Sequence, residues 1–231
     1  MNKIADPDVV KVYQENHRKD SSDKIYPNLM LLRALNFLKG ACSPRTLDYG
    51  CGYGANTVLL GSISREIYYA DTCPVALEKT QSKLIKNLSK APHFKTLIEP
   101  NSNALPFDNG QFELVVCASV LSLLSSEENV RHLLTEFQRV LVEGGKIFID
   151  INGPESEFVY YSDCVGPDTY VYRGREKTGN PIQVFCPQSV ENFKQIVVDY
   201  FDIIVCGHTS HTLMNYREQE FILIGSKQEL I

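Results

Sequence analysis

The sequence has no continuous apolar run that approaches the ~18 residues a helix needs to span a bilayer. Its first residues, Met-Asn-Lys-Ile-Ala-Asp-Pro-Asp, also lack the apolar stretch of a signal peptide. A membrane protein and a secreted protein are therefore both disfavoured, and we expect the chain to lie in the cytoplasm.

Basic residues are outnumbered by acidic ones. The 231 residues include 23 Lys or Arg and 28 Asp or Glu, which gives a formal net charge of −5 and a pI near 5.6. This balance argues against a protein that binds phosphate backbones, so we expect no nucleic-acid partner. Hydrophobic residues make up 43% and charged residues 22%, an ordinary composition for one folded domain of this length.

The seven cysteines form no C-x-x-C pair and no spacing typical of a metal site. An odd number of cysteines scattered through apolar segments indicates reduced thiols in a cytosolic protein. The sequence therefore predicts no bound metal.

The stretch 46–60, TLDYGCGYGANTVLL, organises the rest of the chain. Its pattern indicates a short strand, a loop and the start of a helix, an arrangement that often cradles adenosine-type cofactors. Glycines can take positive φ and let a ligand approach the backbone closely; those of the loop are Gly50, Gly52 and Gly54. By itself the loop also fits the G-x-G-x-x-A pattern of a dinucleotide-binding protein.

A strand at 66–70 follows and ends at Asp71, which stands 21 positions after Gly50 (71 − 50). Carboxylates about 20 residues beyond such a glycine often accept hydrogen bonds from ribose hydroxyls. Alternatively, the carboxylate caps the helix that Asp71-Thr-Cys-Pro opens. Given the glycine loop upstream, we prefer ribose binding.

Alternating strands and helices predict right-handed crossovers and a mostly parallel, Rossmann-like α/β sheet with helices on both faces. The seven expected strands are 46–49, 66–70, 94–98, 112–119, 146–151, 202–206 and 220–225. The expected helices are 7–18, 27–39, one from 55, 71–90, 125–141 and 187–200. Pro27 stands in the first turn of the second helix. A Ser125 to Glu128 capping box begins the fifth, and Gly144-Gly145 ends it. The segment between the last two strands is too short for a helical crossover, so these strands should pair antiparallel.

We interpret residues 1–231 as a single domain with two additions to the sheet. Residues 1–44 form a helical preamble, in which one stripe should pack on the domain: Leu31, Leu35 and Leu38. Candidates for a lid in the same segment are Tyr13, His17 and Tyr26. Residues 152–186, rich in glycine, proline and aromatics, lack periodicity; we interpret them as an insertion over the substrate side, with a variable surface loop as the alternative.

From Thr46 to Lys227 these features resemble the class I S-adenosylmethionine-dependent methyltransferases. LDYGCGYG at 47–54 looks like the first motif of that family. ALPFDNGQFELV at 104–115 looks like the family's stretch before and into its fourth strand, and VEGG at 142–145 stands where the family commonly has a proline and two glycines. The terminal antiparallel strand also distinguishes this family from dehydrogenases.

The resemblance implies S-adenosylmethionine as the cofactor. The three loop glycines would admit its methionine and ribose parts, with Asp48 near the amino group. Asp71 would hold the ribose hydroxyls, and Thr72 would border the adenine. Asn101, followed by Ser102, stands where the family often has a polar residue against the adenine amino group.

At the end of the fourth strand, the segment 117–119, Cys-Ala-Ser, would form the floor of the site, with Cys117 and Ser119 under the reacting sulfonium. A general base is needed only if the acceptor loses a proton during attack. The candidates are His208, His211, Asp150, Glu155, Glu157 and His17. There is no Asn/Asp-Pro-Pro-Tyr/Phe sequence after this strand, which disfavours nucleic-acid amino-methylation.

The leading hypothesis is methyl transfer to a small-molecule acceptor, with oxygen ahead of nitrogen or carbon. A second hypothesis is an NAD-dependent oxidoreductase that uses the same loop. A third is a methyltransferase-like domain that has lost activity and serves as a binding or scaffolding subunit. Cofactor choice separates the first two, and cofactor binding without turnover would indicate the third. The sequence does not predict an oligomeric state.

Overall fold

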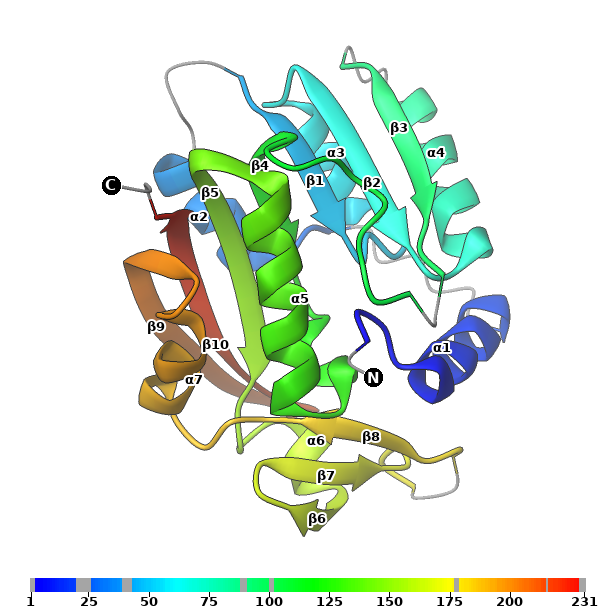
Figure 1. Ribbon diagram of the computed structural model, residues 1–231. Helices are drawn as coiled ribbons and strands as arrows, with labels where there is room; N and C mark the ends of the chain where they lie inside the picture. Colours follow the sequence, from blue (N-terminus) through cyan, green and yellow to red (C-terminus); the bar gives the residue numbers. More distant parts are fainter. Residues whose placement is uncertain are drawn as a thin grey trace.

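The computed structural model describes residues 3–19, 26–38, 43–87, 91–99, 102–176, 179–214 and 216–228. Figure 1 shows one twisted central sheet with helices on both faces and a smaller sheet beneath its lower end. Within the described part of the chain, no helix is both long enough and apolar enough to cross a membrane.

The central sheet has seven strands in the order β3-β2-β1-β4-β5-β10-β9. Their bounds are β1 Arg45–Tyr49, β2 Glu66–Asp71, β3 His93–Leu97, β4 Phe112–Cys117, β5 Leu141–Asn152, β9 Phe201–Leu213 and β10 Tyr216–Lys227. Neighbours from β3 to β5 pair parallel, whereas β10 runs antiparallel to both β5 and β9. The predicted Rossmann-like sheet with an antiparallel last strand is thereby confirmed.

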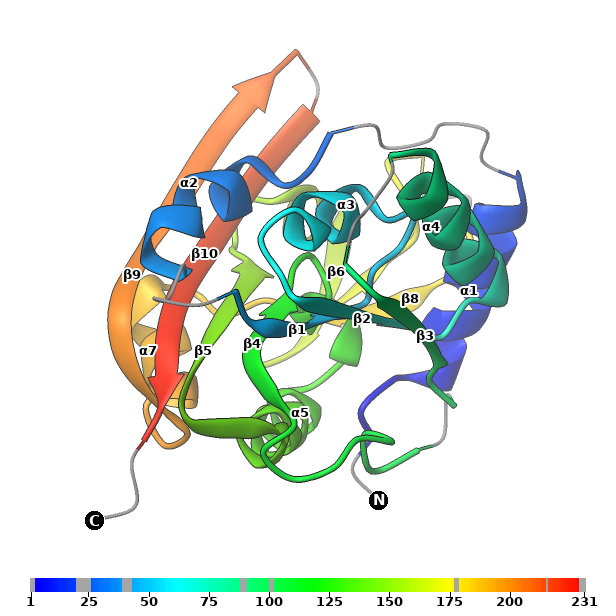
Figure 2. The same cartoon turned by 90° about the horizontal axis from the view of Figure 1, so that it is seen from above.

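Each face of the sheet is covered by its own set of helices (Figure 2). The bounds are α2 Leu29–Leu38, α3 Ala55–Gly61 and α4 Pro74–Lys86 on one side, with α5 Glu127–Val140 and α7 Val190–Val197 on the other. Because β4 lies at the centre, its sequence FELVVC is buried at five of six positions. Leu31, Leu35 and Leu38 are buried on α2, as the preamble stripe predicts.

Two predicted helix starts are wrong. In each case the residue after the predicted one caps the helix with its polar side chain. At α2, Asn28 Oδ1 accepts from the main-chain nitrogens of Met30 and Leu31, so Pro27 precedes the helix. At α5 the cap is Ser126, whose hydroxyl accepts from the main-chain nitrogen of Asn129, and not Ser125.

Other boundaries also differ from the prediction. The helix α5 ends at Val140 and β5 begins at once, so Gly144-Gly145 lies inside the strand. Ser189 caps α7, which therefore begins at Val190 rather than Pro187. For α4 the structure places the end at Lys86, and the predicted extension at 88–90 lies outside the described residues.

The last two strands extend far beyond their predicted ends. β9 and β10 pair from Phe201 and Lys227 up to Leu213 and Tyr216, so most of the predicted connection is itself a hairpin. Threonine, histidine and tyrosine side chains in this stretch suit a pleated strand, and cross-strand pairing supplies the main-chain hydrogen bonds. The hairpin projects past the rest of the sheet in Figure 2.

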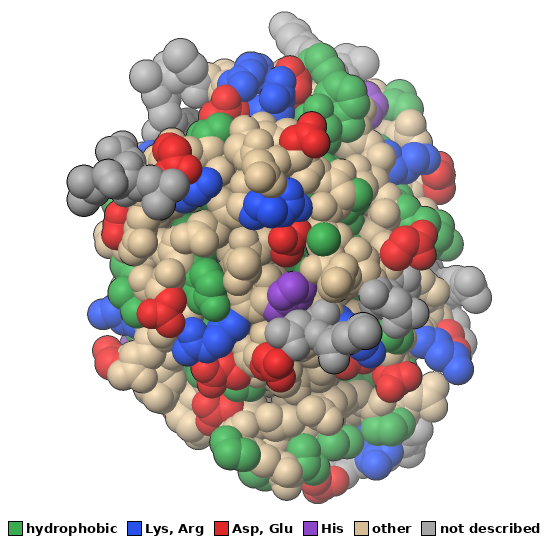
Figure 3. All heavy atoms as spheres, in the orientation of Figure 1, with side chains coloured by type: hydrophobic (Ala, Val, Ile, Leu, Met, Phe, Trp, Pro, Cys, Tyr) green, Lys and Arg blue, Asp and Glu red, His purple; other side chains and the backbone are tan. Residues whose placement is uncertain are grey.

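Residues 152–186 form small elements of their own. They are α6 Glu157–Tyr160, β6 Ser162–Gly166, β7 Thr169–Tyr172 and β8 Ile182–Phe185, and the strands make an antiparallel sheet in the order β6-β7-β8. Val9 on α1 Pro7–Lys19 packs with Tyr170, Ile182 and Val184 of this sheet. The insertion is therefore joined to the N-terminal helix. Acidic and basic side chains are interspersed over the face shown in Figure 3.

Candidate functional site

The glycine loop between β1 and α3 has a left-handed backbone at all three predicted glycines, with φ of 71° at Gly50, 51° at Gly52 and 78° at Gly54. A Cβ atom at Gly50 would lie 2.3 Å from the side chain of Val120, and one at Gly54 would lie 2.9 Å from the Cα atom of Thr80. At Gly52 a Cβ atom would meet nothing within 4 Å. Two of the glycines are thus required by packing, while Gly52 leaves open space for a ligand to approach.

Asp71, at the end of β2, braces this loop. Its Oδ2 accepts from the main-chain nitrogen of Gly52 at 2.8 Å, and its Oδ1 accepts from that of Cys73 at 2.9 Å. Cys73 is the N-cap residue of α4. Asp71 therefore supports the start of the next helix, and it also lines a cavity beside the loop.

The cavity has a volume of about 1500 Å³ and opens at the carboxyl ends of the parallel strands. Among the predicted cofactor residues, those that line it are Gly50, Gly52, Asp71, Thr72 and Ser119. Those that do not line it are Asp48, Gly54, Ser102 and Cys117. Asn101 lies outside the described residues.

Asp48 is buried beneath the glycine loop, with 1% of its surface exposed. The hydroxyl of Thr57 on α3 donates to its Oδ2 at 2.5 Å. Burial raises the pKa of Asp48 to about 7, against the lowering effect of that hydrogen bond. The carboxylate therefore joins β1 to α3 from below the loop.

Asp150 holds the main chain at the end of β4, on the opposite wall of the site. Its Oδ1 accepts from the main-chain nitrogen of Ser119 at 2.5 Å, and its Oδ2 accepts from the side-chain amide of Asn28 at 3.2 Å. Ser119 has a φ of 61°, so this bond holds a backbone conformation that is unusual for serine. Asn56 Oδ1 accepts from the Asn28 main-chain nitrogen at 2.8 Å. Asn28, which the sequence did not single out, thus connects the preamble to α3 and β5.

The N-terminal segment closes the cofactor side of the cavity. Ile4 is fully buried, and its carbonyl oxygen accepts a hydrogen bond of 2.7 Å from the Tyr49 hydroxyl. The hydroxyl of Ser125 donates to Asp6 Oδ2 at 2.7 Å, and the side chain of Gln14 donates to the carbonyl oxygen of Thr72 at 2.8 Å. Of the lid candidates, Tyr26 lines the cavity with 82% of its surface exposed. The side chains of Tyr13 and His17 lie outside what the structure describes.

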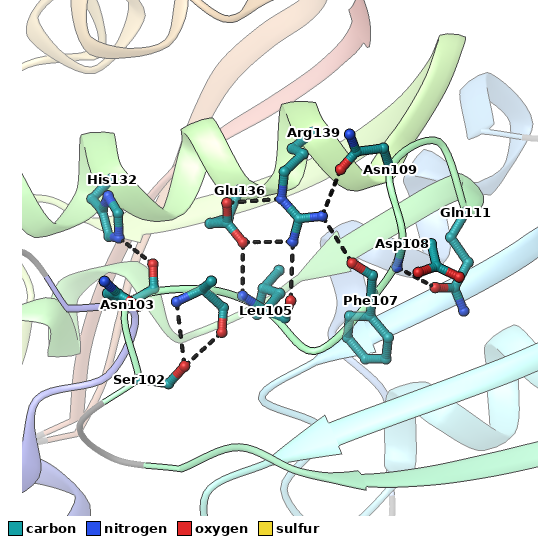
Figure 4. Close-up of polar contacts among 11 residues, drawn as sticks. Ser102, Asn103, Leu105, Phe107, Asp108, Asn109, Gln111, His132, Glu136 and Arg139 are labelled. Carbon is teal, nitrogen blue, oxygen red and sulfur yellow. Dashed lines mark hydrogen bonds and ion pairs between the residues drawn. The ribbon is translucent and has the colours of Figure 1, made fainter.

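The loop that follows β3 is fixed to α5 by one ionic cluster (Figure 4). Arg139 donates to the carbonyl oxygens of Leu105 and Phe107, and pairs with Glu136, which accepts from the Leu105 main-chain nitrogen at 2.7 Å. Burial opposes ionisation of Glu136, but the bonds from Arg139 and Leu105 prevail and lower its pKa. This cluster sets the path of residues 102–111 beside the cavity.

The other end of the cavity is lined by the projecting hairpin and the insertion. Thr209 and His211 of β9 and Glu218 and Glu220 of β10 line it together. The Nε2 atom of His211 lies 3.1 Å from Glu218 Oε2. Of the base candidates whose side chains are described, only His211 lines the cavity.

The remaining base candidates have other contacts. Glu155 accepts from the hydroxyl of Ser210 at 2.8 Å. Glu157 forms an ion pair with Arg175, and the guanidinium of Arg175 lies 5.5 Å from the ring centre of Tyr216. Glu157 and Arg175 therefore fasten the insertion to the hairpin. His208 lies on β9 but does not line the cavity.

In the described part of the chain, no group of three or more His, Cys, Asp or Glu side chains is arranged to hold a metal ion.

Comparison with known proteins gives concordant results. Residues 47–149 match the sequence model of a methyltransferase domain. A curated relative, the uncharacterized methyltransferase YodH of Bacillus subtilis (strain 168), is 31% identical over 111 residues. That alignment covers 47% of this chain and 44% of the relative, so the chain matches less than half of the relative's length.

Solved structures share the fold over most of the chain. A SAM-dependent methyltransferase of Methanosarcina mazei superposes with a TM-score of 0.69 at 15% identity, covering 89% of this chain and 100% of that one. The magnesium protoporphyrin IX methyltransferase of Synechocystis PCC 6803, solved with bound SAM, gives a TM-score of 0.56 at 15% identity, covering 96% and 82%. At such identities the similarity is one of fold.

Proposed function

We propose that the chain is an S-adenosylmethionine-dependent methyltransferase, as the methyltransferase-domain match at residues 47–149 and the shared fold support, and that it transfers the methyl group to a hydroxyl oxygen of a small-molecule acceptor. One observation supports the proposal above others. A single cavity includes the glycine loop and Asp71 as well as His211, whose Nε2 lies beside a carboxylate of Glu218. The same cavity therefore has a cofactor end and an acceptor end.

The residues of the cofactor end fit S-adenosylmethionine. The space over Gly52 is open, and the Asp71 carboxylate adjoins it. Each carboxylate oxygen can accept more than one hydrogen bond, so Asp71 would also accept from ribose hydroxyls. Gly50 would border the methionine part, and Thr72 with Ile98 would border the adenine. Ser119 would lie under the reacting centre, held by Asp150.

When bound, S-adenosylmethionine supplies a methyl group on a positively charged sulfur; a carbon–oxygen bond to the acceptor forms as the carbon–sulfur bond breaks, and that electron pair stays on sulfur. His211 supplies the base. With Nε2–H donated to Glu218, its Nδ1 has a free lone pair that can accept the hydroxyl proton. Glu218 orients the ring and stabilises the imidazolium that forms. His211, at the acceptor end of the cavity, therefore removes the proton, and no residue of the cofactor end takes part in this step.

The first test is calorimetric titration of the protein with S-adenosylmethionine, S-adenosylhomocysteine and NAD in parallel. We expect both sulfur nucleosides to bind and NAD not to bind. Binding of NAD alone would favour the oxidoreductase hypothesis. Binding of the sulfur nucleosides without turnover of any phenol, sugar or amine would favour an inactive binding subunit.

The acceptor atom is tested with His211→Gln. We expect its kcat for hydroxyl acceptors to fall by roughly 10²–10⁴-fold, the usual contribution of a positioned general base. Its affinity for S-adenosylhomocysteine should stay unchanged, because the cofactor end is intact. His93→Gln, at the start of β3, is the matched histidine control. Equal turnover of an amine acceptor by wild type and His211→Gln, with no hydroxyl turnover by either, would replace oxygen by nitrogen.

A further inference from the structure

The arginines of this protein fall into two groups. Six of the described arginine side chains have a protein partner; they are Arg45 with Glu66, Arg65 with Glu113, Arg131 with Glu127, Arg139 with Glu136, Arg175 with Glu157, and Arg217 over the ring of Tyr160. The side chains of Arg33 and Arg173 have no hydrogen bond, ion pair or ring contact in the described part of the chain. Both of these line the cavity.

Arg173 is held in place by its backbone. It directly follows β7, its carbonyl oxygen accepts from the main-chain nitrogen of Gly179 at 2.9 Å, and Gly174 after it turns the chain with a φ of 83°. The residue is half-buried. A planar cation with five donors and no partner among the described residues, at a fixed place in a cavity wall, suits an anionic ligand.

Arg175, two residues later in the same cavity wall, has a structural role. It lines the cavity too, but Glu157 and Tyr216 engage its guanidinium. The insertion thus places Arg175 against the hairpin, whereas Arg173 has no side-chain partner among the residues that the structure describes. Since the protein has 28 acidic residues for 23 basic ones, a shortage of carboxylates does not explain this difference.

Arg33 approaches the cavity from a different element. It lies on α2, which packs against β10, and α6 of the insertion packs against the same strand. Arg33 is exposed, and neither it nor Arg173 forms an ion pair with a described acidic residue; Glu218 contacts His211 instead. Glu176 is exposed to solvent and forms no ion pair with a described residue.

We propose that the acceptor is an anionic small molecule, bearing a carboxylate or a phosphate group beside its hydroxyl, and that Arg173 binds the anionic group with Arg33 as a second cation. The inference rests on the proposed function, because it names the acceptor class of the same site. A bidentate contact to one carboxylate or phosphate satisfies the guanidinium and fixes the orientation of the acceptor. The hydroxyl can then be presented to His211.

The test compares matched acceptors that differ in charge. Two pairs are 4-hydroxybenzoate with 4-hydroxybenzamide and glucose 6-phosphate with glucose, which also separate a carboxylate from a phosphate preference. Each is assayed for methyl transfer and titrated into protein loaded with S-adenosylhomocysteine. We expect at least one charged member to bind, and to be methylated, at least tenfold better than its neutral partner.

Three variants locate the effect. Arg173→Gln should raise KM for the charged acceptor at least tenfold and leave the neutral one unchanged, Arg173→Lys should retain part of the preference, and Arg65→Gln should behave as wild type. A preference for neutral acceptors, or an equal effect of Arg173→Gln on both members of a pair, would overturn the inference. Binding of the acids without any methyl transfer would instead contradict the proposed function while leaving the anion site standing. If no compound binds the loaded protein, the anion site is rejected.

Discussion

The hydroxyl of Tyr49, the last residue of β1, donates a hydrogen bond of 2.7 Å to the main-chain carbonyl oxygen of Ile4. Both residues are buried and both line the cavity, although they lie 45 positions apart in the sequence. This bond ties the N-terminal segment to the end of the strand that leads into the glycine loop. The same hydrogen bond therefore contributes to the stability of the fold and holds the N-terminal segment over the cofactor end of the cavity.

Tyr49→Phe leaves the carbonyl group of Ile4 buried without its partner. We expect the free energy of unfolding to fall by roughly 1–3 kcal/mol, the desolvation cost of such a group. Dissociation of S-adenosylmethionine should also become faster, because the N-terminal segment is held less firmly. Urea unfolding and stopped-flow release measure the two effects.

Tyr69 provides the matched control. Its hydroxyl is buried without a partner in the described part of the chain, and burial raises its pKa to about 12. Tyr69→Phe removes an unsatisfied group and should leave stability unchanged or raise it by up to about 1 kcal/mol. Equal losses in the two variants would show that the bond to Ile4 is not what Tyr49 contributes.

Asp71→Ala should weaken binding of S-adenosylmethionine by at least about tenfold, since a carboxylate that accepts from hydroxyls contributes on the order of 1.5–3 kcal/mol. The same variant removes the bonds to the main-chain nitrogens of Gly52 and Cys73, so a modest loss of thermal stability should accompany it. Calorimetry and circular dichroism separate the two effects. Asp202→Ala, at the opposite end of the sheet, is the control. Unchanged affinity in Asp71→Ala would exclude the ribose assignment.

The buried carboxyl of Asp48 should make stability depend on pH. Its pKa in the folded protein is about 7, above the value of 3.8 for an unfolded chain, so the folded state holds a proton that the unfolded state releases between these values. Stability therefore falls as pH rises through this window, by ~1.4 kcal/mol for each unit of pKa difference. Above pH 7 the loss is complete.

Asp48→Asn keeps an oxygen that can accept from Thr57 but removes the charge. We expect the variant to melt several degrees higher than wild type at pH 8, on the scale of 2–4 °C for roughly each kcal/mol. At pH 4 the two proteins should melt together. A constant difference at every pH would mean that the effect arises from packing and not from ionisation.

Arg139→Gln should destabilise the protein by roughly 3 kcal/mol, because the largely buried Glu136 carboxylate loses its counterion. Hydrogen exchange at the amide of Leu105 should become faster, since that amide donates to Glu136. Arg131→Gln on the same helix is the control. Its partners Glu127 and Asp199 are exposed, so its cost should stay below about 1 kcal/mol. Similar losses in both variants would contradict the role assigned to the cluster.

The regular elements could be predicted because their signals are local. Apolar runs such as FELVVC mark buried parallel strands, and helical spacing marks the stripe with Leu31. The glycine loop was found because its backbone needs positive φ, and only a short list of residues tolerates that. The cap of α5 was misplaced because Ser125 and Ser126 are adjacent, and Ser125 donates instead to Asp6, which is distant in sequence. At α2 the predicted start at Pro27 is wrong because Asn28, the next residue, caps the helix.

By itself, the sequence determined the order of strands and helices, the glycine loop with Asp71 at the neighbouring strand end, and the antiparallel last strand. These follow from periodicity, chain length between elements and backbone sterics, all of which act over a few residues. Only the tertiary structure decided that Ile4 meets Tyr49, that Asp150 holds Ser119 and Asn28, and which of the described arginines have a side-chain partner. Such contacts join segments far apart in the chain, and their hydrogen bonds and charges are satisfied by geometry that no local pattern encodes.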